Sequence, residues 1–453
     1  MNTREDPRRA IPSMSELLET DEAAGLMARH ARGPVAAALR AAADEFRRTG
    51  AAADAGAILA AAGEKLEADE LDRLRPVVNA TGILLHTGLG RAVLPKEAAA
   101  GLAQMDRCCN LQIDLATGKR GKRNYLSERL LCELTGAEAA LIVNNNAAAT
   151  LLILAALCPG REVVVSRGEL IEIGGSYRLP DCITASGARM REVGTTNKTH
   201  LRDYEGAIGE DTGALLRVNP SNYRVIGFSQ RVALDELAAL AKKRGLLLID
   251  DLGCGALVDL SAYGLPRESR VQDSLAAGAD VVCFSGDKLI GGPQAGIVAG
   301  KKALLDRIRK HPLTRMLRVG KLTDMALEQT LRLFREPERL PERHPLYRML
   351  AKKRPALRAA AERLAAAIGA GAAVEDGASE MGGGALPGVE LPTALVAVRS
   401  DKLSAAEIAK RLRCREVPVV ARIQEDQVVL DVRTLLPGEE EIAAEAVKEV
   451  LRG

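Results

Sequence analysis

Short runs of aliphatic and β-branched residues alternate with helical patterns through the middle of the chain. Turns that carry glycine or proline separate the two kinds of segment. Alternation of strand and helix is typical of a parallel sheet covered by helices on both faces. A doubly wound α/β domain is therefore predicted, with buried strands at Ala140–Asn144, Glu162–Ser166, Ala214–Val218, Leu246–Asp250 and Asp280–Phe284.

The flanking patterns differ from this region and predict three domains in all. Residues 1–70 are alanine-rich with apolar residues at helical spacing, which predicts a small helical domain before an α/β domain at residues 71–344. A long predicted helix at Leu322–Glu336 leaves the α/β domain. Residues 345–453 then mix both patterns and predict a small α+β domain, with helices at Leu357–Ile368 and Ala405–Leu412, a closing helix, and strands at Ala394–Val398 and Val428–Val432.

Composition narrows the class of protein. With 453 residues, 47% of them hydrophobic, and no apolar run of membrane-spanning length, the chain is expected to be soluble and cytoplasmic. The eight cysteines form no C-x-x-C pair, so reduced thiols and no metal site are expected. A net charge of +3 and 2% aromatic residues do not indicate a nucleic-acid binder. Residues 1–75 carry 11 Lys and Arg against 14 Asp and Glu, so an RNA contact there would need a local basic face, around Arg29, Arg32, Arg40, Arg47 and Arg48.

The most specific motif is S-G-D-K-L-I-G-G-P-Q-A-G at Ser285–Gly296, directly after a predicted buried strand. A lysine that forms a Schiff base with pyridoxal 5′-phosphate (PLP) must lie at a strand end, among small residues that admit the cofactor. An isolated Lys-x-x-Gly-Gly is more often a surface turn, but the whole string is far more specific than its parts. Lys288 is therefore predicted to bind PLP.

A pair of carboxylates, Asp250 and Asp251, ends the strand that precedes the lysine strand. PLP enzymes hold a carboxylate against the pyridine nitrogen, because a protonated ring is a better electron sink. Asp251 is the favoured residue, since a turn of small residues follows it. Taken alone, such a pair more often caps a helix.

A further polar segment, Asn145, Asn146 and Ala147, connects the first predicted strand to a helix. Backbone N–H groups at a helix start bind phosphate, helped by the helix dipole. These residues are candidates for the cofactor phosphate, and ordinary capping by asparagine is the alternative.

Several arginines lie in turn-like settings, and two of them are three residues apart on one face of a helical turn. A forked guanidinium is the preferred partner of a tetrahedral oxyanion, so a group of them suits a phosphate-like ligand. For residues 119–123 a solvated basic face is the alternative. The four candidates are Arg91, Arg123, Arg315 and Arg318.

Together these strings resemble bacterial selenocysteine synthase, the L-seryl-tRNA(Sec) selenium transferase family, over nearly the whole chain. The likeness is also carried by Ala10–Met14, Val78–Gly82, His86–Arg91, Ser166–Ser176, Val193–His200, Ser221–Tyr223, Asp251–Gly255 and Arg315–Leu322. It implies a fold-type-I PLP transferase-like core, an N-terminal domain that recognises tRNA, and a homodecamer.

The resemblance also implies a reaction. Seryl-tRNA(Sec) becomes selenocysteinyl-tRNA(Sec) by β-elimination through aminoacrylyl-tRNA, followed by addition of selenium from selenophosphate. In this sequence Lys288 matches the PLP lysine and Asp287 an active-site aspartate that works with an arginine, here Arg123. The arginines matching those that bind the selenium donor are Arg91, Arg315 and Arg318.

The chain departs from the family pattern at three places. Arg123 stands in Gly-Lys-Arg-Asn where the family more often has Gly-Ser-Arg-Tyr, which leaves Arg120 as an alternative for its role. Gly88 replaces a common asparagine, and Asn219-Pro220 replaces a His-Thr pair. These changes bear on substrate preference rather than on PLP binding. The alternative function is a PLP lyase acting on a small amino acid or amino sugar without tRNA.

Overall fold

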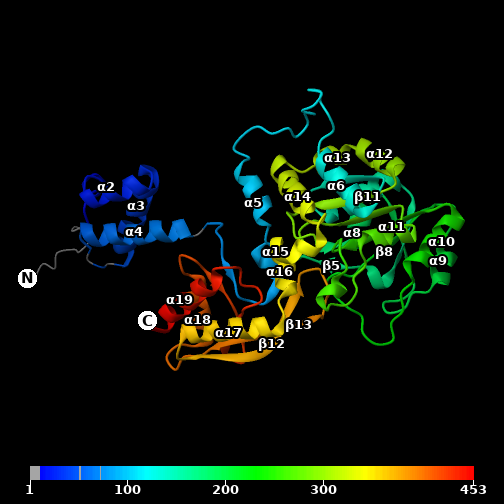
Figure 1. The fold of residues 1–453 in the computed structure, drawn as a ribbon. Helices are drawn as coiled ribbons and strands as arrows, with labels where there is room; N and C mark the ends of the chain where they lie inside the picture. The colour runs from blue at the N-terminus through cyan, green and yellow to red at the C-terminus, as the bar shows by residue number, and fades with distance from the viewer. Residues whose placement is uncertain (1–10, 50, 52, 72, 453) are drawn as a thin grey trace, which may run out of the picture. The chain divides into compact units, whose positions relative to one another are not determined.

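A computed structural model describes residues 11–49, 51, 53–71 and 73–452. The first ten residues of the predicted N-terminal domain lie outside this range. The described chain forms two compact units (Figure 1). The first holds the residues up to Val77 with Glu416–Pro418, and the second holds Val78–Arg415 and the residues from Val419 onward.

The first unit is built from four helices. They are α1 (Met14–Leu18), α2 (Asp21–Arg29), α3 (Arg32–Thr49) and α4 (Ala55–Leu71). The apolar faces of these helices meet in a core that contains the fully buried Leu17, Leu39 and Ile58. Alanine at many of the remaining positions favours helix and allows close approach.

A seven-stranded sheet forms the centre of the second unit. Its order is β3 (Ala139–Val143), β11 (Gly296–Gly300), β10 (Val281–Ser285), β9 (Leu247–Gly253), β8 (Thr212–Val218), β4 (Glu162–Ser166) and β7 (Arg189–Val193). Only β11 runs antiparallel to its neighbours. The carboxyl ends of the other strands therefore meet at one edge.

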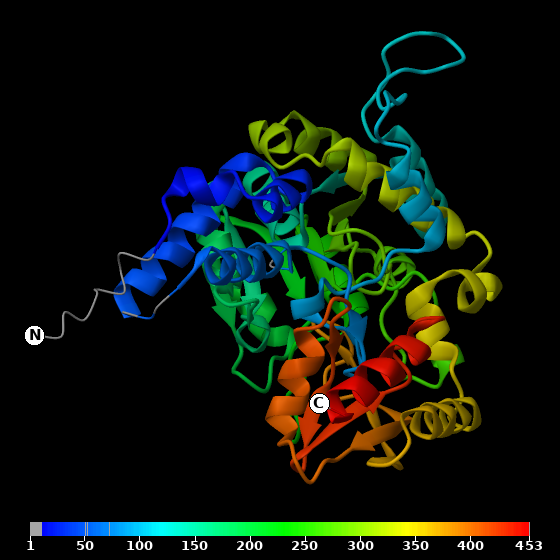
Figure 2. The same cartoon turned by 90° about the vertical axis from the view of Figure 1, so that its left-hand side faces the viewer.

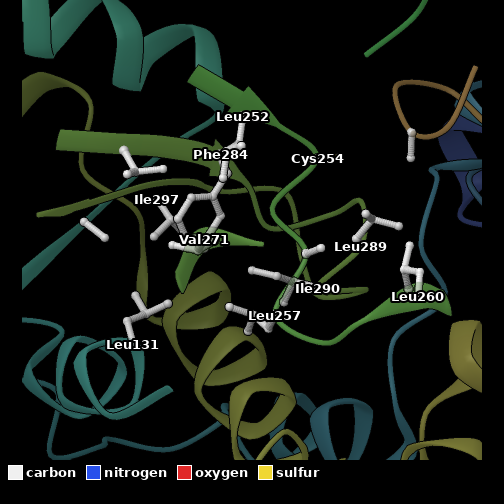
Figure 3. Packing of buried hydrophobic residues seen from close by; sticks show 14 of the residues in the cluster. Leu131, Leu252, Cys254, Leu257, Leu260, Val271, Phe284, Leu289, Ile290 and Ile297 are labelled. Carbon is white, nitrogen blue, oxygen red and sulfur yellow. The ribbon is translucent and has the colours of Figure 1, made fainter. Parts of the chain in front are cut away.

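Alternate residues of these strands belong to two separate hydrophobic clusters, one on each face of the sheet. Along β10, Val282 and Phe284 belong to one cluster, whereas Val281 and Cys283 belong to the other. Because successive strand side chains point to opposite faces, a strand buried on both sides needs a continuous apolar run. Figure 3 shows the first cluster, where Phe284 lies beside Ile297 of the adjacent strand.

Helices cover both faces. They are α6 (Tyr125–Thr135), α7 (Asn146–Leu157), α8 (Leu179–Ala185), α9 (Leu201–Ala207), α10 (Leu234–Arg244), α11 (Val271–Ala277), α12 (Lys302–Lys310), α13 (Pro312–Met316) and α14 (Lys321–Leu333). Helix α7 begins where β3 ends, so its first turn lies at the same edge as the strand ends.

A second, five-stranded sheet belongs to the same unit. Its order is β15 (Arg422–Gln424), β16 (Gln427–Asp431), β13 (Glu390–Val398), β12 (Ala372–Gly382) and β2 (Ile83–Leu85). Its own hydrophobic cluster is shared with α17 (Arg354–Ile368), α18 (Ala405–Arg413) and α19 (Glu439–Arg452). In Figure 2 the red closing helix α19 lies against the orange strands of this sheet.

The predicted fold class is confirmed, and all five predicted strands of the large sheet are present within a few residues. Of the two larger sheets, the prediction missed β7, β11 and β12 and the short strands β2 and β15. Strand β7 reads Arg-Met-Arg-Glu-Val, has only one buried residue and lies at a sheet edge, so it lacks an apolar run. Strand β11 is bounded by glycines, and β12 contains Gly377 and several polar residues. For these strands tertiary pairing overrides weak local propensity.

Candidate active site

A cavity of about 240 Å³ lies at the carboxyl edge of the large sheet. Open α/β sheets bind ligands at this edge. The strand ends of β9 and β10 and the first turn of α7 all contribute to its lining. Among the lining residues are Lys288, Asp251, Asp287, Asn146 and Arg91.

Lys288 lies in the tight turn that follows β10. Two backbone bonds close this turn, from Gly286 N–H to the Ala295 carbonyl at 2.8 Å and from Gly292 N–H to the Gly286 carbonyl at 2.9 Å. The lysine is only 8% exposed. Burial lowers the pKa of its ammonium group, because desolvation disfavours the charged form. A larger neutral fraction makes the amine both a nucleophile and a base.

Two buried side chains hold the backbone just beyond the lysine. The hydroxyl of Tyr347, on α16 (Pro345–Ala351), donates to the Leu289 carbonyl at 2.8 Å. The Nε2 of His344 lies 2.9 Å from the Ile290 carbonyl. Burial lowers the pKa of His344 to about 4, so its ring is neutral and Nε2 carries the hydrogen that it donates. Neither residue was predicted from the sequence.

The two adjacent aspartates of β9 have different partners. Asp251 faces the cavity, and its Oδ1 accepts from Asn146 Nδ2 at 2.7 Å while its Oδ2 accepts from Thr150 Oγ1 at 2.9 Å. Asp250 is fully buried and forms an ion pair with Arg217 at 3.1 Å. Because successive side chains of a strand point to opposite faces, Asp251 faces the cavity and Asp250 forms a structural ion pair on the other side.

Burial raises the pKa of Asp251, whereas its hydrogen bonds to Asn146 and Thr150 oppose this shift. A cation in the cavity would therefore be a favourable additional partner for this carboxylate. Thr150 was not predicted, although it lies one helical turn after Asn146 on α7, a spacing that the sequence contains.

The residues predicted for a phosphate lie at the start of α7. The side chain of Asn145 caps the helix by accepting from Ala148 N–H at 2.9 Å. Asn146 and Ala147 line the cavity with the first helical turn. Oδ1 of Asn146 is buried and has no protein partner within the described chain. Opposite this turn, a Cβ at Gly296 would lie 2.0 Å from the Asn145 carbonyl, so only glycine allows this approach.

Asp287, beside the lysine, is paired with Arg91. Nη1 of Arg91 lies 2.7 Å from Oδ2 of Asp287, and the aspartate is nearly fully buried. Arg91 adopts a left-handed backbone conformation with φ of 61°. Its Nε is buried without a partner in the part of the chain that the structure describes.

The remaining predicted arginines form a second group. Charge repulsion from Arg315 and from Arg123 lowers the pKa of the exposed Arg318. Backbone bonds join this segment to the end of β3, where Asn144 N–H donates to the Leu317 carbonyl at 2.9 Å. None of the three lines the lysine cavity, and Arg91 rather than Arg123 is the ion-pair partner of Asp287.

The loop between β12 and β13 passes directly over the lysine. A Cβ at Gly384, where φ is +89°, would lie 2.5 Å from Nζ of Lys288. A Cβ at the preceding Gly383 would lie 2.3 Å from the Thr87 side chain. The glycines therefore let the backbone close over the amine, a contact that the sequence does not predict.

One aromatic side chain, Tyr177, also lines the cavity. It is half-buried at the start of β6 (Tyr177–Arg178), and burial raises the pKa of its hydroxyl. The sequence left open which residue could lie against a cofactor ring. Tyr177 is the aromatic residue available there in the described lining.

Comparison with known proteins identifies the family. A model described as L-seryl-tRNA selenium transferase matches residues 77–436, and one described as Selenocysteine synthase N terminal matches residues 8–47. The chain belongs to the L-seryl-tRNA selenium transferase family. The family resemblance predicted from the sequence is thereby confirmed.

Individual relatives match over most or nearly all of the chain. The L-seryl-tRNA(Sec) selenium transferase of Geobacter sulfurreducens is 46% identical over 97% of this chain and 98% of its own. The proteins of the same name from Hyphomonas neptunium and Desulfovibrio desulfuricans are 45% and 48% identical, over 98% and 84% of this chain and 98% and 82% of their own.

A solved structure agrees with the family at the level of the fold. D-glucosaminate-6-phosphate ammonia-lyase superposes with a TM-score of 0.59 over 86% of this chain and 97% of its own, at 22% identity. At that identity the likeness concerns the fold alone, which is the predicted fold-type-I architecture. Within the described residues, no helix is both long and apolar enough to cross a bilayer.

Proposed function

We propose that this chain converts L-seryl-tRNA(Sec) to L-selenocysteinyl-tRNA(Sec), with PLP as cofactor and selenophosphate as selenium donor. The observation that carries the proposal is the buried Lys288, whose pKa is lowered, in one cavity with an Asp251 carboxylate fixed by Asn146 and Thr150. Membership of the family supports the choice of reaction.

The residues of the cavity fit PLP. Lys288 would hold the aldehyde carbon, Asp251 the pyridine nitrogen, and Asn145, Asn146 and Ala147 the phosphate at the start of α7. The unpartnered Asn146 Oδ1 supports this assignment, since a buried polar atom without a partner points to an absent ligand. When bound, PLP accepts the electron pair that is released as a proton leaves Cα.

In this reaction the side chains of the protein would transfer protons and hold charges close to the reacting atoms. Nζ of Lys288, once free, takes the proton from Cα of the seryl group. Asp287 and Arg91 form an ion pair in the same cavity as this amine and would assist departure of the β-hydroxyl. Arg91 would thus take the role that the family resemblance gives to Arg123.

The serine hydroxyl leaves with a proton as water when the Cβ–O bond breaks. Selenium of selenophosphate then forms the Cβ–Se bond and Cα regains a proton. The P–Se bond breaks as a water oxygen takes the phosphoryl group, so that phosphate is released.

The selenium donor needs cationic partners because it carries several negative charges. Arg315 and Arg318 are proposed to bind its phosphate-like end together with Arg91. Repulsion among neighbouring guanidinium groups, which lowers the pKa of Arg318, supports this role, since a bound dianion would relieve it.

The macromolecular partner and assembly also form part of the proposal. Seryl-tRNA(Sec) would contact the N-terminal helices, and the chain would assemble as a homodecamer. Three of the five arginines expected on a basic face there already pair with acids, Arg29 with Glu67, Arg47 with Asp44 and Arg48 with Glu45. Arg32 and Arg40 are therefore the stronger candidates for an RNA contact in this unit.

The test of this proposal is the visible absorbance of the purified, PLP-loaded protein during titration. Seryl-tRNA(Sec) should change the spectrum, and free serine at the same concentration should not. A spectrum that changes with a small amino compound and ignores the charged tRNA would instead favour a lyase.

A further inference from the structure

Two fully buried side chains contact the turn that carries Lys288. The Tyr347 hydroxyl donates to the Leu289 carbonyl at 2.8 Å, and Nε2 of His344 lies 2.9 Å from the Ile290 carbonyl. These carbonyls belong to the first two residues after the lysine. Neither side chain is among the described residues that line the lysine cavity. Any effect of the two side chains on a ligand in the cavity must therefore pass through the turn itself.

We infer that His344 and Tyr347 are positioning residues, which place the amine of Lys288 for linkage to the PLP aldehyde and for proton transfer at the seryl Cα. The inference rests on the proposed function and deepens it, because it names the groups that hold the amine in place. The two bonds then control the reactivity of the lysine and leave the affinity of the cavity for the cofactor unchanged.

The segment beyond the lysine is enclosed on its other sides. Leu289 N–H donates to the Cys254 carbonyl at 3.2 Å. The side chains of Leu289 and Ile290 are fully buried in the hydrophobic cluster of Figure 3. A buried carbonyl without a donor costs free energy. Without His344 or Tyr347, the turn would have to shift until its carbonyls reached another donor or water.

A group of aromatic rings holds both donors in one orientation. The chain has only six tyrosines, four phenylalanines and no tryptophan. Phe334 lies edge-on to both donors, with ring centroids 5.7 Å from Tyr347 and 5.9 Å from His344. The rings of His344 and Tyr347 are 5.1 Å apart and nearly perpendicular, and Tyr263 lies 5.6 Å from Tyr347. Because edge-to-face contacts favour a specific geometry, the two donors stay directed at their carbonyls.

The ring of His344 also touches the turn directly. A Cβ at Gly291, where φ is +66°, would lie 2.2 Å from Cε1 of His344. Nδ1 of the ring is buried without a hydrogen-bond partner within the described residues. A leucine at position 344 would avoid this unsatisfied nitrogen but would leave the Ile290 carbonyl without its donor. The polar ring therefore fits a role in holding the turn better than a role in the hydrophobic core.

The amine itself has little room to follow a displaced turn. The backbone of Gly384 passes over it, and a Cβ at that glycine would lie 2.5 Å from Nζ. Lys288 is thus confined between the turn, which His344 and Tyr347 hold, and the loop above it. Misplacing a reacting group by about 1 Å can lower a rate by about 10²-fold, so a small shift of the turn should be measurable in the reactivity of the amine.

The experiment compares the full-length wild type with Tyr347→Phe, His344→Leu and His344→Gln. The first two variants remove a donor, whereas the glutamine keeps a neutral N–H for the Ile290 carbonyl. Tyr204→Phe is the matched control, because it removes the hydroxyl of another buried tyrosine of the same hydrophobic cluster, on helix α9.

Two probes separate reactivity from affinity. The rate of linkage is followed by the visible absorbance after PLP is mixed with the PLP-free protein. Affinity is measured by calorimetry with 4′-deoxypyridoxine 5′-phosphate, which has no aldehyde and cannot link to the lysine. Steady-state kinetics with seryl-tRNA(Sec) then give KM and kcat for the PLP-loaded proteins.

Tyr347→Phe and His344→Leu should each slow the linkage and lower kcat by at least about tenfold, with KM unchanged. Affinity for the aldehyde-free analogue should equal that of wild type in every variant, because Asp251 and the start of α7 are intact. His344→Gln should recover most of the lost rate, and Tyr204→Phe should match wild type.

A wild-type linkage rate in Tyr347→Phe or in His344→Leu would overturn the inference for that residue. An equal loss of analogue affinity, or the same slowing in Tyr204→Phe, would also overturn it, since either indicates a general loss of structure. If His344→Leu does not fold, Tyr347→Phe decides, because it removes a single oxygen atom. Slower linkage with unchanged analogue affinity, in a protein that does not convert seryl-tRNA(Sec), would support the inference and reject the proposed function.

Discussion

Gly384 and Lys288 are sterically coupled, because a Cβ on residue 384 would lie 2.5 Å from the lysine Nζ. Lys288 lies in the turn after β10 of the large sheet, and Gly384 lies in the loop between β12 and β13 of the five-stranded sheet. The lysine amine can occupy its position only because the loop above it has no side chain there.

Replacing Gly384 with alanine should therefore displace the amine. We expect Gly384→Ala to lose the visible absorbance of lysine-linked PLP and to lower turnover by at least about tenfold, as for a misplaced catalytic group. Gly388→Ala is the matched control, since Gly388 is in the same loop with φ of +70° but has open space around its Cβ. Equal loss of absorbance in both variants would show that backbone strain, not contact with the lysine, is responsible.

The neighbouring aspartates of β9 should respond differently to the same substitution. Asp251→Asn removes the charge proposed for the pyridine nitrogen and should lower kcat by about 10²–10³-fold with little change in thermal stability. Asp250→Asn leaves Arg217 without its buried partner and should lower the free energy of unfolding by about 3 kcal/mol. Kinetics and chemical denaturation of both variants measure the difference, and a reversed pattern would exchange their roles.

Below pH 10.5, the ordinary pKa of a lysine side chain, Lys288 should make the PLP-free protein less stable. Burial lowers the folded-state pKa below the unfolded value of 10.5, so the unfolded chain binds more protons between the two values. Stability from this group is complete above pH 10.5 and is lost as the pH falls toward the folded-state pKa. Lys288→Met should thus be more stable than wild type at pH 7, and its advantage should shrink as the pH approaches 10.5. A difference that does not vary with pH would contradict this account.

Arg315 and Arg318, whose segment is joined to the end of β3, should bind oxyanions even when no selenium is transferred. Inorganic phosphate is expected to inhibit wild type competitively against selenophosphate. Arg315→Ala and Arg318→Ala should each weaken this inhibition by about tenfold, since a charged hydrogen bond is worth about 1.5–3 kcal/mol. Arg309→Ala is unsuitable as a control because that residue pairs with Glu128. The exposed Arg413 is suitable, and equal inhibition of all variants would remove these arginines from the site.

The parts of the site that the sequence predicted are those in which local order along the chain determines the contact. Lys288 follows β10, Asp251 lies near the carboxyl end of β9, and parallel strands bring their carboxyl ends to one edge. Asn145 and Asn146 follow from the junction of strand and helix in the same way.

The parts that were not predicted depend on contacts between distant segments. Gly384, His344 and Tyr347 reach the lysine turn from regions whose sequence resembles an ordinary loop and an ordinary helix. The spacing of Thr150 from Asn146 could have identified it in the sequence, but Thr150 belongs to no recognisable motif. Arg91, which pairs with Asp287, has a left-handed backbone conformation, and this is uncommon for a residue other than glycine and is not signalled by the sequence.

The most direct test of the account is conversion of seryl-tRNA(Sec) by the purified, PLP-loaded protein with selenophosphate, followed by analysis of the amino acid released from the tRNA. Wild type should yield selenocysteine, and Lys288→Ala should yield only serine while still binding the charged tRNA. Selenocysteine formation by Lys288→Ala at the wild-type rate, or its absence with the wild-type protein, would contradict the central claim.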